Sequence, residues 1–190
     1  MTAFAGRAKP SAMGPQLDPG IAQAASARQP SWLADLLAKR QPLVMGVLNV
    51  TPDSFSDGGR FIEPRLAVEQ AERMIAAGAD IIDVGAESTR PYGGAAPVSS
   101  EDELARLAPV LPAIVNLKTP VSIDTMKSGV AAWALDQGVM MVNDVWGLQR
   151  DPAMAGIVSQ HEVPIVIMHN RDDADRALDI VADVTAIFER

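Results

Sequence analysis

This sequence contains no cysteine and only two histidines among its 190 residues. Disulfides and thiolate metal sites are therefore excluded, and two histidines are too few for a histidine-rich zinc site. No apolar run is long enough to cross a bilayer, and the N-terminus lacks the basic segment and apolar core of a signal peptide. These absences predict a cytoplasmic protein.

Positive charge is also scarce, because 16 Lys and Arg stand against 24 Asp and Glu, giving a net charge of −8. The imbalance is uneven: residues 1–42 carry +3, and residues 43–190 carry −11. We therefore expect neither nucleic acid nor an anionic membrane as a partner. An anionic substrate would need a local arginine, a helix N-terminus or a metal ion to hold it.

Residues 1–31 lack hydrophobic periodicity and are rich in Ala, Pro, Gly, Ser and Gln. That composition predicts a disordered N-terminal extension. A folded domain is predicted over residues 32–190, opening with a short helix over 32–40 that Ser31 caps.

Short apolar runs then alternate with helical patterns five times. This order is typical of a parallel α/β sheet with helices outside it. The predicted strands are Leu43–Leu48, Asp80–Val84, Val121–Ile123, Val139–Val142 and Pro164–Met168. No G-x-G-x-x-G or P-loop pattern follows any strand, so we favour a TIM-type (β/α)8 barrel over a doubly wound sheet. About five of its eight βα units are present; the alternative is a complete five-stranded open sheet.

The helices between these strands carry start and stop signals. Pro64 opens a helix that Gly78 ends, and Lys127–Gln137 forms another that Gly138 ends. Ser100 and Glu103 fit a capping box, followed by a helix that Pro109 and Pro112 kink. Asp151-Pro152 and Asp175–Arg190 predict the last two helices.

Each predicted strand is followed by polar side chains, which in a parallel barrel surround a single mouth. They are Asn49, Asp83, Asp124, Asn143-Asp144 and His169-Asn170. Such a group favours a hydrogen-bonding pocket for a polar, planar ligand. Structural interpretations remain open: Asp144 and Asn170 fit turn caps better, Asp83 is either inward-facing or bonded to backbone, and His169 alone is more often structural.

Five segments, in order, resemble dihydropteroate synthases of the pterin-binding barrel family. They are MGVLNVTPDSFSDGGRF, GADIIDVGAESTRP, VSIDTMKSGVAAWAL, VNDVWGL and IMHN, between about Leu43 and Asn170. The resemblance implies a folate-biosynthesis transferase that joins 6-hydroxymethyl-7,8-dihydropterin diphosphate to p-aminobenzoate, releasing pyrophosphate, and that is a sulfonamide target. It also implies a Mg²⁺ cofactor, small-molecule partners only, and a possible homodimer.

The resemblance assigns roles to nine residues of this chain. Asn49 is implied as the metal-linked residue, and Asp53 and Asp57 as catalytic residues on a mobile loop that also carries Phe55. The substrate-binding residues implied are Thr89 and Arg90 for the diphosphate, Asp124 and Asn143 for the pterin ring, and Phe55 and Met168 for the rest of the pocket. Methionines, including Met168, are otherwise common core fillers.

The chain also departs from the family pattern. The stretch YGGAAP at 92–97 is longer and richer in glycine than the family's second loop, which bears on sulfonamide affinity. Acidic, lysine, arginine and histidine residues that follow later strands in the family have no counterpart here. We therefore expect the 190 residues alone to be inactive. The alternatives are a pterin-binding methyltransferase of the same fold and a non-catalytic pterin-binding fragment.

Overall fold

The computed structural model describes residues 30–51, 63–87, 97–172 and 175–189. Its centre is a sheet of five parallel strands: β1 (Met45–Asn49), β2 (Ile81–Gly85), β3 (Val121–Asp124), β4 (Met141–Asp144) and β5 (Ile165–Ile167). The strands lie in chain order, β1-β2-β3-β4-β5. In a doubly wound sheet the order of the strands reverses at a switch point. The order here does not reverse, so the sheet is part of a barrel, as predicted.

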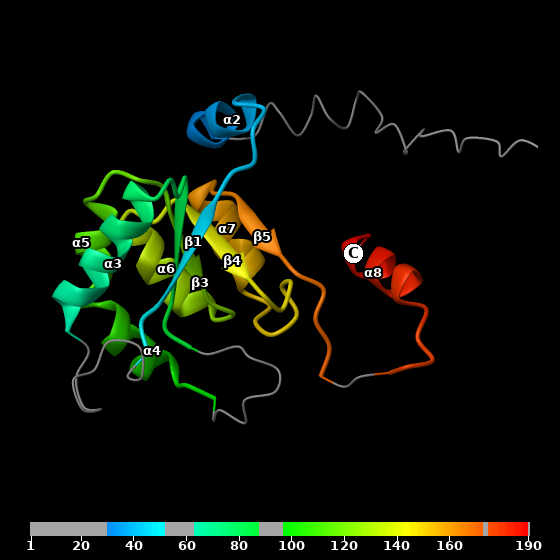
Figure 1. The fold of residues 1–190 in the computed structure, drawn as a ribbon. Coiled ribbons are helices and arrows are strands. Elements are labelled where there is room, and N and C mark those ends of the chain that lie inside the picture. The colour runs from blue at the N-terminus through cyan, green and yellow to red at the C-terminus, as the bar shows by residue number, and fades with distance from the viewer. Residues whose placement is uncertain (1–29, 52–62, 88–96, 173–174, 190) are drawn as a thin grey trace, which may run out of the picture.

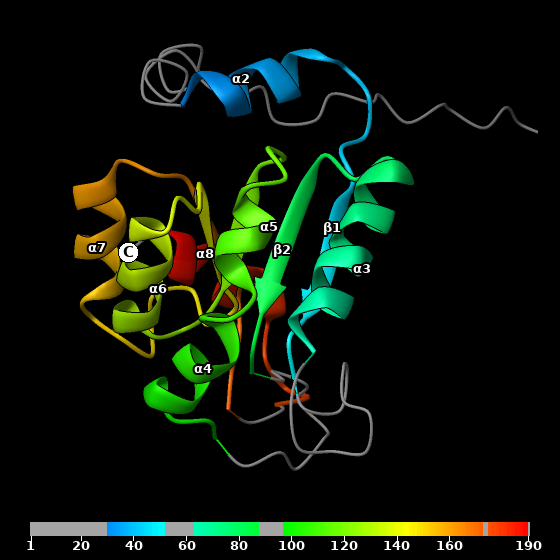
Figure 2. The same ribbon diagram turned by 90° about the vertical axis from the view of Figure 1, so that its left-hand side faces the viewer.

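Five helices cover one face of the sheet (Figures 1 and 2). They are α3 (Pro64–Ala76), α4 (Ser100–Leu107), α5 (Leu111–Val115), α6 (Ser128–Asp136) and α7 (Met154–His161). Helix α2 (Ser31–Ala38) lies beyond the N-terminal ends of the strands, and α8 (Ile180–Phe188) lies on the opposite side of the sheet from α3–α7.

The hydrophobic core lies between the sheet and α3–α7. Alternate strand residues face these helices and are almost fully buried, among them Leu48, Ile82, Ile123 and Val142. The intervening residues face the other, inner side. There the apolar Val47 and Val166 are 55% and 38% exposed. Because side chains alternate between faces along a strand, the same strands build the core on one side and the candidate site on the other.

Several local predictions need correction. Helix α2 begins at Ser31 with Pro30 as its N-cap and without a side-chain cap, so Ser31 is not the cap. The capping residue of α4 is Ser99, which accepts from the Asp102 backbone N–H and donates to the Asp102 carboxylate. The expected box at Ser100 and Glu103 does not form, because Glu103 points into the protein, where it is fully buried.

The proline-containing helix is two helices, since α4 ends at Leu107 and α5 starts at Leu111. Proline removes a backbone donor and clashes with the preceding turn, so Pro109 and Pro112 break the helix rather than kink it. The last two helices start later than predicted, at Met154 and Ile180. The predicted N-terminal extension lies outside the described residues up to residue 29.

Candidate active site

Three of the predicted site residues occupy one row across the inner face of the sheet. In the strand register, Asn49 pairs with Gly85, Gly85 with Asp124, and Asp124 with Asn143. Residues paired in register point to the same face. The row continues to Val166 on β5. Polar side chains from β1, β3 and β4 therefore gather at the C-terminal ends of the strands, as expected of a barrel mouth.

Gly85 leaves room for the Asp124 carboxylate. A Cβ atom at position 85 would lie 3.2 Å from Asp124 Oδ2, closer than an ordinary van der Waals contact. Burial, together with the smaller effect of the negative charges of Asp83, Glu103, Asp144 and Glu87, raises the pKa of Asp124 to about 7. Near neutral pH, Asp124 can therefore hold or release a proton.

Asp83 lies one row below on the same face and is hydrogen-bonded to Asn143 of this row. Asn143 Nδ2 donates to Asp83 Oδ2 at 3.0 Å. Asp83 is only 3% exposed. Burial raises its pKa, and the Ser122 hydroxyl and Asn143 amide partly oppose that rise. Of the two interpretations of Asp83, the inward-facing one is correct, since its carboxylate accepts a hydrogen bond from a side chain of the inner face.

Three acceptor oxygens of this group have no hydrogen-bond partner within the described part of the chain. They are Asp83 Oδ1, Asp124 Oδ1 and Asn143 Oδ1. An unpaired buried acceptor costs about 1–3 kcal/mol. A planar ligand whose edge carries N–H donors would satisfy the free oxygens of Asp124 and Asn143, since carboxylate and amide oxygens suit that edge.

The remaining polar residues at the strand ends have structural partners. Asp144 accepts from the backbone N–H groups of Trp146 and Leu148, which fixes the turn after β4. Asn170 accepts from its neighbour's backbone N–H. His169 Nε2 lies 2.6 Å from Asp183 Oδ2 on α8. The turn-cap interpretation of Asp144 and Asn170 and the structural interpretation of His169 are thus the ones that fit the contacts.

A buried ion cluster beside the site was not predicted. Lys127 Nζ bonds to the carboxylates of Glu87 and Glu103, with Glu103 at 2.6 Å. Glu87 also accepts from the Val98 backbone N–H, so the cluster joins Glu87 and Val98 to α4 and, through Lys127, to the N-terminus of α6. Burial lowers the pKa of Lys127, but its bonds to Glu103 and Glu87 more than offset this and leave the pKa raised. One feature of the sequence could have indicated this cluster. Glu103 is charged but lies four residues before Leu107, on the apolar face of the predicted helix.

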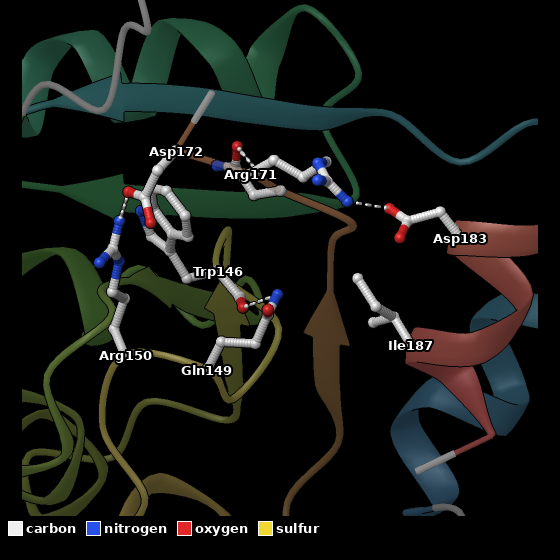
Figure 3. A pocket seen from close by; sticks show the side chains of 8 residues that line it. Trp146, Gln149, Arg150, Arg171, Asp172, Asp183 and Ile187 are labelled. Atoms are coloured by element: carbon white, nitrogen blue, oxygen red, sulfur yellow. Dashed lines mark hydrogen bonds and ion pairs between the residues drawn. The ribbon is translucent and has the colours of Figure 1, made fainter. Parts of the chain in front are cut away.

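A pocket of about 380 Å³ lies near the ends of β4 and β5, and Asp183 and Ile187 of α8 line one side of it (Figure 3). Its two arginines are neutralised: Arg150 pairs with Asp172 and stacks on Trp146, and Arg171 pairs with Asp183. Bonds from His169 and Arg171 lower the pKa of Asp183. This cavity does not include the inner-face row, which opens instead onto the uncovered side of the sheet.

The other predicted site residues are distributed differently. Met168 is 48% exposed just after β5, so it is not core filler. Asn49 is exposed at the end of β1. Five residues lie outside the described residues: Asp53, Phe55, Asp57, Thr89 and Arg90.

The described residues were also considered as a metal site. They contain no group of three or more His, Asp or Glu side chains placed to hold a metal ion. Asn49 nevertheless fits Mg²⁺, which takes oxygen ligands and usually keeps several waters, so that one protein oxygen is a sufficient anchor. Among the helices that the structure describes, none is long and apolar enough to cross a membrane.

The chain was then compared with known proteins. The family of pterin binding enzymes matches residues 45–190. A dihydropteroate synthase from Bacillus subtilis is 50% identical over 136 residues, covering 71% of this chain and 47% of the relative. The chain thus spans about half the length of the curated relatives it matches.

Solved structures agree in fold. The dihydropteroate synthase of Clostridium difficile, determined in the presence of pteroic acid, superposes with a TM-score of 0.73 at 45% identity, over 79% of this chain and 57% of that one. The Xanthomonas albilineans enzyme with 4-aminobenzoic acid gives 0.71 at 42% identity, over 79% and 54%. Together with the parallel strands in barrel order and the polar row at their ends, these matches show that the chain belongs to the pterin binding enzyme family.

Proposed function

We propose that this chain functions in dihydropteroate synthesis, joining 6-hydroxymethyl-7,8-dihydropterin diphosphate to p-aminobenzoate. The observation that carries the proposal is the inner-face row, in which Asp124 and Asn143 are paired in register and each holds a buried oxygen without a protein partner. A pterin presents an amino group and a ring N–H on one edge. These two donors are complementary to the free oxygens of Asp124 and Asn143. That the ligand is a pterin follows from the family to which the chain belongs.

In the proposed reaction, the bond between the pterin methylene carbon and the diphosphate oxygen breaks. The same carbon forms a bond to the nitrogen of p-aminobenzoate, which loses a proton. Asp124 and Asn143 hold the ring so that the methylene group points toward the mouth. An ionised Asp124 accepts a charge-assisted hydrogen bond, which is about twice as strong as a neutral one.

The leaving diphosphate requires charge neutralisation. Asn49 lies in the same row and is exposed at the mouth, so its side-chain oxygen would hold Mg²⁺ beside the diphosphate. When bound, the metal would supply positive charge to the departing oxygens. We assign Thr89 and Arg90 to the diphosphate, and Asp53, Phe55 and Asp57 to the p-aminobenzoate side. Those assignments follow from the family resemblance.

We further propose that residues 1–190 expressed alone are inactive and poorly soluble. Within the described residues, β1 and β5 each have one sheet neighbour. Val47, Val166 and Met168 leave apolar surface on the inner face. Unpaired strand edges and exposed apolar patches promote association.

The decisive experiment incubates the full-length protein with the pterin diphosphate, p-aminobenzoate and Mg²⁺, and measures pyrophosphate release. Release that requires both substrates is expected. Binding of 6-hydroxymethylpterin without turnover would instead support a non-catalytic pterin-binding protein, and folded protein that does neither would refute the proposal.

The residue assignments are tested by Asn143→Ala, for which pterin affinity should fall by about tenfold or more, since a lost partner costs about 1–3 kcal/mol. Asp136→Ala on α6 removes an exposed carboxylate and is the control. Unchanged pterin affinity in folded Asn143→Ala would show that Asn143 has only a structural role.

A further inference from the structure

Asp83 is a buried acid at the middle of β2, and no residue role assigned so far uses it. Its register neighbours on the inner face are Val47 and Ser122. It is 3% exposed, and no cation is paired with it among the described residues. Burying a carboxylate without a cation is costly, so the hydrogen bond that Asp83 accepts from Asn143 indicates what the position does.

That bond decides which end of the Asn143 amide faces the site. A side-chain amide has a donating nitrogen and an accepting oxygen, and it can be turned over with little change in shape. Asp83 Oδ2 takes the nitrogen end at 3.0 Å. An ionised carboxylate only accepts, so the reversed amide would place two acceptors against each other. Asn143 Oδ1 is therefore held as the free end.

We propose that Asp83 is a positioning residue that fixes the Asn143 amide with its oxygen toward the ligand. Asn143 and Asp124 then present two acceptors side by side, and the site selects heterocycles whose edge carries two N–H donors. The inference rests on the proposed function for the identity of the ligand as a pterin. The orientation of the amide itself does not depend on that function.

The first test is the binding of 6-hydroxymethylpterin to the full-length protein at pH 8.5. Asp83→Leu removes the acceptor at similar volume, so neither the rotamer nor the orientation of the Asn143 amide is held any longer. The competent arrangement should fall to about a tenth of the population or less, and the dissociation constant should rise at least tenfold. Asp83→Asn keeps one accepting oxygen but permits both orientations. If the two become equally populated, the rise is about twofold. Met141→Leu is the control, because it is a volume-conserving change in the row that contains Asp83 and Ser122, and it should stay within twofold.

A double-mutant cycle separates positioning from a general effect on folding. Because Asp83 acts through Asn143, Asp83→Leu should change pterin affinity less than twofold in an Asn143→Ala background. Independent, multiplicative losses would overturn the proposal, because Asp83 would then act on the ligand or the fold directly. In steady state, Asp83→Leu should raise the KM for the pterin diphosphate without a matching change in the KM for p-aminobenzoate. Where Asp83→Leu does not fold, Asp83→Ala, which also removes both carboxylate oxygens, takes its place in the same cycle with the same expected result.

A ligand-free measurement distinguishes this proposal from the proposed function. The side-chain amide signals of Asn143, identified by their loss in Asn143→Ala, should show slow hydrogen exchange in the parent protein and fast exchange in Asp83→Leu. If that change occurs but no pterin binds, the positioning role stands and the proposed function fails. If Asp83→Leu leaves these signals unchanged, the positioning proposal is wrong whether or not pterin binds.

Discussion

Replacing Asp124 with asparagine should make the protein more stable and a poorer pterin binder. The pKa of Asp124 is raised to about 7 from an ordinary value of 3.8. Burial is the largest cause, and the negative charges of Asp83, Glu103, Asp144 and Glu87 add to it. The folded state therefore binds this proton more tightly than the unfolded state does. The stability that protonated Asp124 contributes to the folded state is fully present below about pH 4 and is lost as the pH rises through about 7.

The size of the effect follows from the two pKa values. At 1.36 kcal/mol for each tenfold change, the ionised carboxylate costs the folded state about 4 kcal/mol at pH 8.5 and about 1 kcal/mol at pH 4.5. Asp124→Asn removes this charge at nearly constant volume. Its free energy of unfolding should therefore exceed that of the parent by up to about 4 kcal/mol at pH 8.5, and by much less at pH 4.5.

Urea denaturation of both proteins at the two pH values tests this. Asp136→Asn, which neutralises an exposed carboxylate on α6, should change stability by about 0.5 kcal/mol or less at either pH. In the same preparations, Asp124→Asn should bind 6-hydroxymethylpterin roughly tenfold to a hundredfold more weakly, because hydrogen bonds to a charged group contribute about 1.5–3 kcal/mol. If Asp124→Asn raised the free energy of unfolding equally at both pH values, or lowered it at pH 8.5, the argument from burial would be refuted.

Two further substitutions, each with a control, test neighbouring features. Lys127→Met should lower the free energy of unfolding by about 3–5 kcal/mol, because it leaves the buried Glu103 carboxylate without its cation. Lys39→Met, which removes one partner of an exposed ion pair, should lower it by about 1 kcal/mol or less in the same denaturation assay. Gly85→Ala places a Cβ atom 3.2 Å from Asp124 Oδ2, so it should weaken pterin binding in a titration; unchanged affinity would mean that the carboxylate moves freely. Gly156→Ala, in open space on α7, should raise stability by about 0.5–1 kcal/mol and leave affinity unaltered.

The sequence was sufficient for the parallel sheet and for three members of the polar row. Apolar runs mark strands because a parallel strand is buried on both faces, and the structure places all five predicted strands, within a few residues. Asn49, Asp124 and Asn143 could be grouped in advance because the C-terminal ends of barrel strands share one mouth. Their functional roles rested on the family resemblance, since Asn and Asp at strand ends are also common turn residues.

What the sequence could not give was side-chain pairing across distant segments. Lys127 meets Glu87 and Glu103 over separations of 40 and 24 residues, and Asn143 meets Asp83 over 60. No local pattern encodes these distances. The misplaced capping box has the same origin: Ser99 and Ser100 are equally good caps locally, and the choice between them follows from the burial of Glu103 against Lys127.

The two faces of the sheet divide stability and chemistry between them. Leu48, Ile82 and Ile123 point outward into the helical layer and supply hydrophobic burial. The next residue along each strand points inward instead. On that face Asp83 and Asp124 have raised pKa values and unpaired oxygens. The free oxygens of Asp124 and Asn143 are unfavourable for folding until a ligand with complementary donors satisfies them. The same mismatch that lowers the stability of the free protein is therefore available as binding energy, which is why substitutions that stabilise the inner face should weaken ligand binding.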